Sequence, residues 1–267
     1  MSRLSECDLS ATPRVGAMTK TATMCEIPWR LEDGGCAALP LPADDSIARV
    51  ARSHVTALLP ALGLSVQDVH DIKLMVSELA TNVLQHAPSA DGPSGAELWV
   101  YQRGDGHGRD ELVVKAFDTR RDWCPRGTAP GRSDHGRGLT IVELLTQGRW
   151  GHHPSRSRLR TPAARGKATW FALPLPHTVR RRHVWRVEGP YATKDLQAML
   201  VQRGLGHFEA EEGTGGTALT DGRGLTVWCE AARFRWRTGS GESGGLPITD
   251  ITEACERIVE LCESSPA

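Results

Sequence analysis

The sequence lacks the marks of several protein classes. No apolar run approaches the about 18 to 20 residues that a transmembrane helix needs, and residues 1–20 hold no apolar stretch typical of a secretory signal. The seven cysteines are scattered and never spaced Cys-x-x-Cys, so neither a disulfide framework nor a zinc site is predicted. We therefore expect a cytoplasmic protein with reduced thiols and no contact with a membrane.

Net charge is also absent, because 32 Lys and Arg residues balance 32 Asp and Glu residues. Overall charge therefore gives no attraction to nucleic acid, although residues 119–182 hold fourteen basic and only three acidic residues. This basic region would attract phosphate or an acidic partner, unless its arginines are simply solvated in loops. No helix-turn-helix, zinc-finger or aromatic RNA-binding motif accompanies the charge, so we expect no direct binding of nucleic acid.

Composition and periodicity divide the 267 residues into four parts, a length sufficient for two domains. Residues 1–37 are rich in Ser, Thr, Gly and Pro without periodicity and are expected to form a disordered arm. Residues 38–177 mix helix and strand patterns, which predicts an α+β domain. The arginine cluster at 178–182 predicts a linker, and residues 183–267 are expected to form a second, smaller α+β domain.

In the larger domain, helical spacing of apolar residues begins at position 47 and stops at Pro60. Ser65 can cap a second helix that ends before Pro88. The segments ELWVYQR and ELVVKAF flank a GDGHG turn and predict a hairpin, a short helix follows GRG, and KATWFALPL predicts the last strand. In the smaller domain we expect a helix around Leu196, strands at LTVWCE and RFRWR, and a final helix around Ile258.

The aromatic residues of the smaller domain have two interpretations. Trp228, Phe234 and Trp236 lie on the two short strands, where they would most simply belong to the core. The alternative is an aromatic face that binds a partner.

Glu78 and Asn82 are the first pair of residues that can carry chemistry. Because they are four residues apart on the second helix, they lie on one side of it, next to the apolar stripe. An Asn oxygen can ligate Mg²⁺, and a nearby carboxylate can take a proton from an attacking hydroxyl group. The alternative is an ordinary exposed helix edge, since Glu-x-x-x-Asn is a common spacing.

Two further features suit a nucleotide. Asp118 ends the apolar run LVVKAF, where its carboxylate could accept a hydrogen bond from an exocyclic amino group or could simply cap a turn. Gly136 and Gly138 open a helix whose backbone N–H groups can receive phosphate, or they form a plain turn.

Taken in this order, these features resemble the GHKL (Bergerat-fold) ATP-binding domain, and within it the anti-sigma-factor serine kinases. The resemblance covers residues about 38–177, through VSELATNVLQHA, AFDTRRDWCPRG, GRGLTIVELL, RWG and GKATWFALPLP. It implies the α/β fold class in the broad sense, and more narrowly the α+β two-layer sandwich of the Bergerat fold. It also implies that this domain binds ATP and Mg²⁺. It also implies that Glu78 is catalytic, that Asn82 ligates Mg²⁺ and that Asp118 reads the adenine amino group. The phosphate-side residues that it implies are Gly136, Arg137, Gly138 and Leu139.

The function implied by the resemblance is a regulator that binds a sigma factor and phosphorylates Ser or Thr of an anti-anti-sigma (STAS-type) partner, with a homodimer left open. The sequence departs from the family pattern where Asp118 is followed by Thr-Arg-Arg-Asp instead of the glycines of Asp-x-Gly-x-Gly, and where Ala168 stands at an expected Thr. The alternative is therefore a non-catalytic regulator that keeps the fold without kinase activity, either binding nucleotide or acting purely by contact with a partner protein. A sensor histidine kinase is disfavoured, because no membrane span or phospho-acceptor helix precedes the domain.

Overall fold

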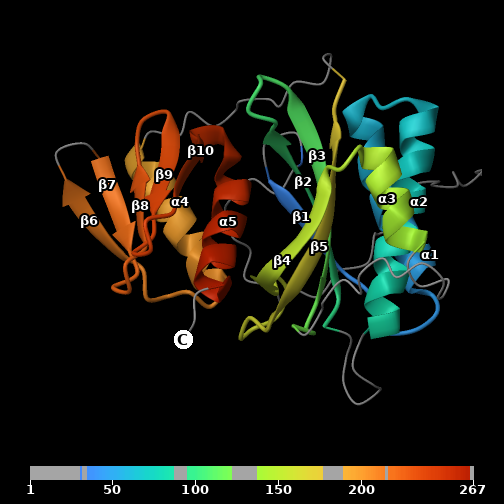
Figure 1. The fold of residues 1–267 in the computed structure, drawn as a ribbon, viewed down its shortest axis with the longest axis horizontal. Helices are drawn as coiled ribbons and strands as arrows, with labels where there is room; N and C mark the ends of the chain where they lie inside the picture. Colours follow the sequence, from blue (N-terminus) through green and yellow to red (C-terminus); the bar gives the residue numbers. More distant parts are fainter. Residues whose placement is uncertain are drawn as a thin grey trace, which may run out of the picture.

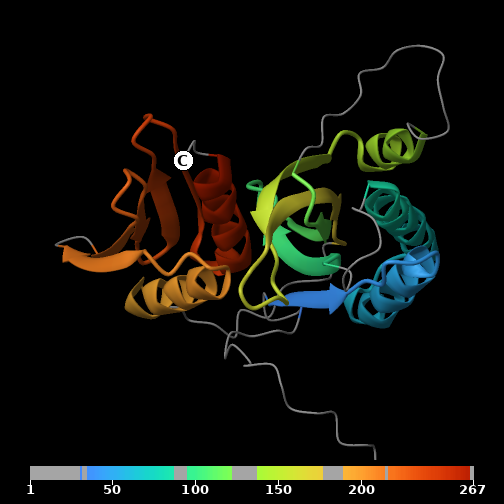
Figure 2. The same ribbon diagram turned by 90° about the horizontal axis from the view of Figure 1, so that it is seen from below.

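The computed structural model describes residues 31, 35–86, 95–121, 137–176, 189–213 and 216–264. These ranges contain ten β-strands and five α-helices, arranged as two five-stranded antiparallel sheets with helices packed on them. Figure 1 shows four layers, in which the small sheet is followed by α4 and α5, the large sheet, and then α1, α2 and α3. Figure 2 shows α5 between the two sheets. The expected α+β character is confirmed.

The large sheet has the strand order β1-β2-β3-β5-β4, with every neighbouring pair antiparallel. The predicted hairpin is confirmed, because β2 and β3 pair from Gly104 and Asp110 at the turn to Glu97 and Phe117 at the other end. Both faces of these two strands are buried, so their apolar residues run without alternation. The strands are β1 (Cys36–Pro40), β2 (Glu97–Gly104), β3 (Asp110–Asp118), β4 (Trp150–Arg156) and β5 (Arg165–Pro174).

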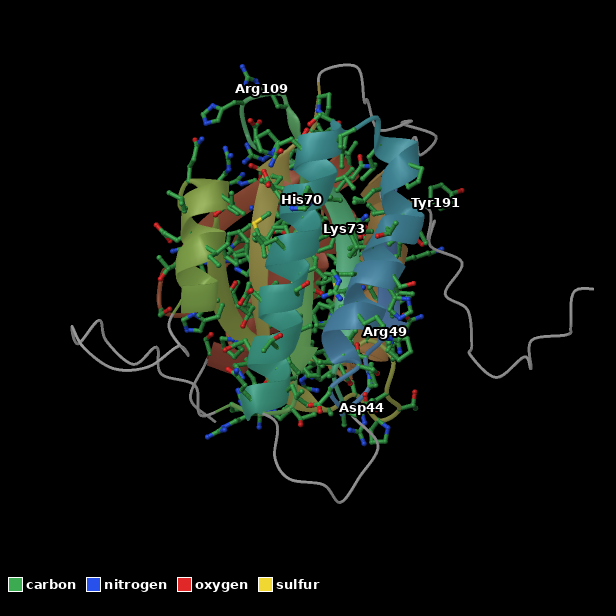
Figure 3. The ribbon with its side chains drawn as sticks, turned by 90° about the vertical axis from the view of Figure 1, so that its right-hand side faces the viewer. Asp44, Arg49, His70, Lys73, Arg109 and Tyr191 are labelled. Atoms are coloured by element: carbon green, nitrogen blue, oxygen red, sulfur yellow. The ribbon has the colours of Figure 1, made fainter. Side chains whose placement is uncertain are left out.

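Three helices cover one face of this sheet, namely α1 (Ile47–Leu58), α2 (Val66–His86) and α3 (Arg137–Thr146). The predicted cap is confirmed, because Ser65 Oγ accepts the Asp68 N–H at 3.1 Å and the Asp68 carboxylate accepts the Ser65 N–H at 3.2 Å. Figure 3 looks onto this helical layer, where the labelled and exposed His70 of α2 and Arg49 of α1 lie on its outer side.

The second unit is a meander with the strand order β10-β9-β8-β7-β6, against which α4 and α5 pack through a shared apolar core. Phe234 and Trp236 belong to this core, as expected, but the expectation for Trp228 was wrong, since 38% of it is exposed. Strand β8 alternates, so Val227 and Cys229 point inward and the residue between them points to solvent. The elements are α4 (Gly189–Gln202), β6 (Glu209–Gly213), β7 (Gly216–Thr220), β8 (Thr226–Cys229), β9 (Arg233–Arg237), β10 (Ser243–Pro247) and α5 (Ile251–Ser264).

The structure departs from two expectations about the chain's organisation, at the N-terminal arm and at β4. Cys36 and Ala37, assigned to the disordered arm, pair with β2 as the first residues of β1, and Leu31 is buried in the core; most of the arm and the linker at 178–182 lie outside the described residues. Strand β4 was not predicted, because its sequence WGHHPSR lacks an apolar alternation. None of the described helices is long and apolar enough to cross a membrane.

Buried charges join α5 to the large sheet. Glu256 forms ion pairs with Arg158 at 2.6 Å, with Lys115 at 3.4 Å and with Arg203, and its own side chain is only 1% exposed. The guanidinium groups of Arg203 and Arg158 lie 4.8 and 5.4 Å from the centre of the Trp99 ring. Burial alone would raise the pKa of Glu256, but the three cations outweigh burial and hold that pKa well below its usual value.

Two more glutamates of α5 face the same sheet. Glu253 accepts a hydrogen bond from the Tyr101 hydroxyl at 2.5 Å, and Glu263 pairs with Arg156 at 2.6 Å and with Arg165 at 2.7 Å. An acidic helix side therefore meets a basic and aromatic sheet face. The basic region seen in the sequence thus has an acidic partner within the same chain.

Candidate functional site

The predicted acidic and glycine features meet between α2 and α3. Glu78 is half-buried on α2, and Gly138 lies in the first turn of α3. A Cβ atom at position 138 would lie only 2.4 Å from Glu78 Oε2, so the start of α3 lies directly against this carboxylate. The structure therefore brings together two residues from separate sequence motifs, a carboxylate and the positively polarised start of a helix.

The other residues predicted for this side belong to the same two helices or directly precede α3. Asn82 is half-buried, one turn along α2 from Glu78. Leu139 is partly buried and packs on the core that α2 and the large sheet share. Arg137 is the first residue of α3, its side chain is outside what the structure describes, and Gly136 lies outside the described residues.

Asp118 is held by a buried lysine that sequence reasoning missed. Its side chain ends β3, and Lys167 Nζ donates to both carboxylate oxygens, at 2.8 and 2.7 Å. The Arg120 N–H donates to Oδ1 at 2.9 Å. Lys167 and Asp118 are direct partners in the β3–β5 register, so the pair becomes visible once those two strands are paired. The carboxylate predicted to read an amino group already accepts hydrogen bonds from an ammonium group.

Gly166 makes this pair possible. A Cβ atom at position 166 would lie 2.0 Å from the Asp118 carbonyl oxygen and 2.7 Å from the Phe117 ring. Only glycine lets the start of β5 come this close to the end of β3, and the next residue then carries its ammonium group to the carboxylate.

The predicted site has a phosphate side and an adenine side, and their residues do not suit ATP equally well. Glu78 and Asn82 offer hard oxygen donors one helical turn apart, which suit Mg²⁺, and the backbone N–H groups at the start of α3 suit a phosphate. On the other side, the ammonium group of Lys167 engages the acceptor that an adenine amino group would need, so the residues fit the phosphate side better than the base side.

Part of the basic charge between residues 119 and 182 is neutralised inside the molecule. Arg121, Arg156, Arg158 and Arg165 pair with glutamates of α5, and Lys167 pairs with Asp118. Arg149 adds an ion pair with Glu111 at 4.0 Å, so within the part of the chain that the structure describes, six of the fourteen basic residues between 119 and 182 have acidic partners. These residues form ion pairs within the chain, which neither sequence interpretation of the basic region expected.

Comparison with known proteins agrees with the order of the motifs. No protein-family model matches the sequence. The chain is 32% identical over 114 residues to the serine-protein kinase RsbW of Bacillus licheniformis, a match that covers 39% of this chain and 70% of that protein. It is also 25% identical over 119 residues to RsbW of Bacillus velezensis, covering 40% and 71% of the two chains. A shorter match, 33% identical over 76 residues, joins it to RsbW of Halalkalibacterium halodurans and covers 28% and 44%. The match to the Bacillus licheniformis protein is 32% identical and covers 70% of that protein. This chain therefore belongs to the family of the serine-protein kinase RsbW.

Proposed function

We propose that this chain is an ATP- and Mg²⁺-dependent regulator of the GHKL type, which binds a sigma factor and phosphorylates Ser or Thr of a STAS-type anti-anti-sigma partner. The observation that carries the proposal is the approach of Gly138 to Glu78, which assembles a carboxylate, an amide one turn away and a helix start. The family relationship supports the same function. Such a role would place the protein in the cytoplasm, with residues 38–177 as the catalytic domain.

Each residue would have a defined task. Asn82 would hold Mg²⁺, which when bound neutralises charge on the phosphate oxygens. Backbone N–H groups at the start of α3 would receive the phosphates. Glu78 would take the proton of the attacking Ser or Thr hydroxyl group. The hydroxyl oxygen would then form a bond to the γ-phosphorus of ATP, while the bond between that phosphorus and the oxygen that leaves with ADP breaks. The close approach of α3 would keep the carboxylate oriented toward this reaction.

Calorimetric titration of Mg²⁺-ATP into the full chain tests the proposal first. Micromolar binding that is lost in Asn82→Ala and in Asp118→Ala supports it, and Gln85→Ala is a matched control because Gln85 is exposed on the same helix. Circular dichroism of each variant checks that the fold is retained. No binding at millimolar ATP, or an Asn82→Ala protein that binds and hydrolyses ATP like the parent, would refute the assignment.

The second candidate function is a regulator that acts by contact alone and keeps the fold without kinase activity. One observation favours it, namely the two hydrogen bonds that Lys167 donates to Asp118, because they engage the acceptor intended for adenine. The sequence Thr-Arg-Arg-Asp after β3 also lacks the glycines that would let the backbone approach a base. Absence of nucleotide binding in the titration above, or nucleotide binding without phosphotransfer to a purified partner, would select a non-catalytic regulator.

A further inference from the structure

A second cluster of polar side chains lies in the smaller unit, away from the site described above. His207 precedes β6, Asp221 follows β7 and Cys262 lies in the last turns of α5. One candidate ligand atom from each residue lies within 4.8 Å of those of the other two. The cluster thus gathers an imidazole nitrogen, a carboxylate oxygen and a thiol sulfur from three separate segments of the chain.

The turn between β7 and β8 holds Asp221 in place. Its Oδ1 atom accepts the N–H groups of Arg223 at 2.8 Å and Leu225 at 2.9 Å, and its own N–H donates to the Leu225 carbonyl at 3.1 Å. Among the hydrogen bonds of the described residues, none uses Oδ2. The carboxylate is therefore oriented by the backbone while one of its oxygens stays available.

The other two residues are positioned by the core of the unit. Cys262 is half-buried on α5 and packs against the apolar core, and within the described part of the chain its thiol forms neither a disulfide nor a hydrogen bond. His207 is exposed, with its ring 5.2 Å from the buried Phe208 ring. A helix and a tight turn thus fix two of the groups, while the third lies at the surface, where an ion from solvent can reach it.

We propose that His207, Asp221 and Cys262 bind a divalent transition-metal ion of the Zn²⁺ type. Imidazole, carboxylate and thiolate are ligands that Zn²⁺ accepts together, whereas Mg²⁺ and Ca²⁺ prefer oxygen alone. In tetrahedral coordination at about 2.0–2.3 Å the ligand atoms are about 3.3–3.8 Å apart, so small side-chain rotations close the observed spacing. The carboxylate and the thiolate balance the charge of the ion, and water or a group from another molecule completes the coordination.

Binding of the ion would have a structural consequence. The metal would tie the last turns of α5 to the turn between β7 and β8. Glu263, the residue after Cys262, pairs with Arg156 and Arg165 of the large sheet. The ion would therefore stiffen the part of α5 that contacts the larger unit. This proposal is independent of nucleotide binding.

Metal titration of the reduced, metal-free full chain tests the proposal. Calorimetry with Zn²⁺ should give one site per chain, and Co²⁺ should give the near-ultraviolet band of a thiolate–cobalt bond. Three variants address the ligands: His207→Ala, Asp221→Asn and Cys262→Ser. Asparagine keeps the oxygen that accepts the two N–H groups of the turn, so this variant removes charge without removing the turn.

The expected result is a loss of Zn²⁺ affinity of at least about 100-fold in each variant, because removing even an outer partner of a ligand costs about 10- to 100-fold. Cys262→Ser should also remove the cobalt band. Zn²⁺ should raise the Tm of the parent and of the controls Cys36→Ser and His70→Ala, but not that of the ligand variants. Both controls change a half-buried thiol or an exposed imidazole elsewhere in the fold.

Three results would overturn the proposal. They are no Zn²⁺ binding by the parent at 100-fold excess over the chain, binding that persists unchanged in all three ligand variants, and a cobalt band that persists in Cys262→Ser. His207→Ala decides the case if the other variants fold poorly, because its exposed side chain contributes little to the core.

Discussion

Glu256→Gln should reveal how far the docking of α5 depends on a single carboxylate. Glu256 is 1% exposed and is the shared partner of Arg203, Arg158 and Lys115. Glutamine has nearly the same shape, so the change removes the charge of this side chain while leaving its volume almost unchanged. The three cations then remain buried with one acceptor fewer and without the negative charge.

The expected loss follows from this geometry. Breaking a buried ion pair by neutralising one partner costs about 3–5 kcal/mol, because an uncompensated charge stays buried. A domain is typically stable by about 5–15 kcal/mol, so the change removes a large fraction of the stability. In urea, with a slope of about 1–3 kcal/mol per molar, a loss of about 3–5 kcal/mol should lower the midpoint by roughly 1–5 M.

Equilibrium unfolding in urea at pH 7, followed by circular dichroism, measures this loss. Glu260→Gln is the matched control on the same helix, because Glu260 is 26% exposed and pairs with the partly exposed Arg257. The control should lose less than about 1 kcal/mol, as partly exposed pairs do. A Glu256→Gln protein within about 1 kcal/mol of the parent would refute the view that this ion network stabilises the docking of α5.

Three further predictions concern other parts of the molecule. His153 is a buried residue of β4 whose Nε2 atom lies 3.0 Å from Lys115 Nζ. Burial and this ammonium group lower the pKa of His153 from 6.5 to about 4, which favours the neutral ring in the folded state. Stability should therefore be full above pH 6.5 and fall by up to about 3 kcal/mol between pH 6.5 and 4, and His153→Gln should flatten this part of the unfolding profile. Lys167→Thr should raise Mg²⁺-ATP affinity by roughly tenfold or more if Asp118 then accepts the adenine amino group, and calorimetry that shows equal affinity would contradict this. Gly138→Ala should lower the rate of phosphate release from ATP by roughly tenfold or more, because the added Cβ atom meets the Glu78 carboxylate. Its Tm should stay close to that of the control Gly206→Ala, since Gly206 has open space around it.

The elements that could be predicted from the sequence are those fixed by local pattern. Helix α2 follows from its apolar stripe and from the Ser65 cap, and the β2–β3 hairpin follows from two apolar runs around a glycine turn. Local pattern failed at Trp228, where the direction of a side chain depended on the register of a short strand. It also failed at β4, a strand of polar and histidine residues that is stabilised by pairing with β5 rather than by its own apolar alternation.

Candidate site residues were predictable as types but not as contacts. The motifs placed Glu78 and Gly138 on separate elements, and only the packing of α2 against α3 shows them together. Lys167 carries no motif, because its meaning comes from the strand register that sets it beside Asp118. The His207 cluster is invisible to spacing rules, since its ligands are drawn from three distant segments. Long-range contacts of this kind depend on topology, which local periodicity does not encode.

The position of α5 between the two sheets has a consequence for the order of synthesis. Trp99, Tyr101 and Phe117 lie on the side of the large sheet that faces α5, and all three are fully buried. Because α5 follows every strand of that sheet in the chain, all five strands are synthesised before α5, the helix that covers this face, exists. During that interval the nascent chain presents aromatic rings beside arginines and a lysine to its surroundings, a surface that chaperones bind and that favours association between unfinished chains.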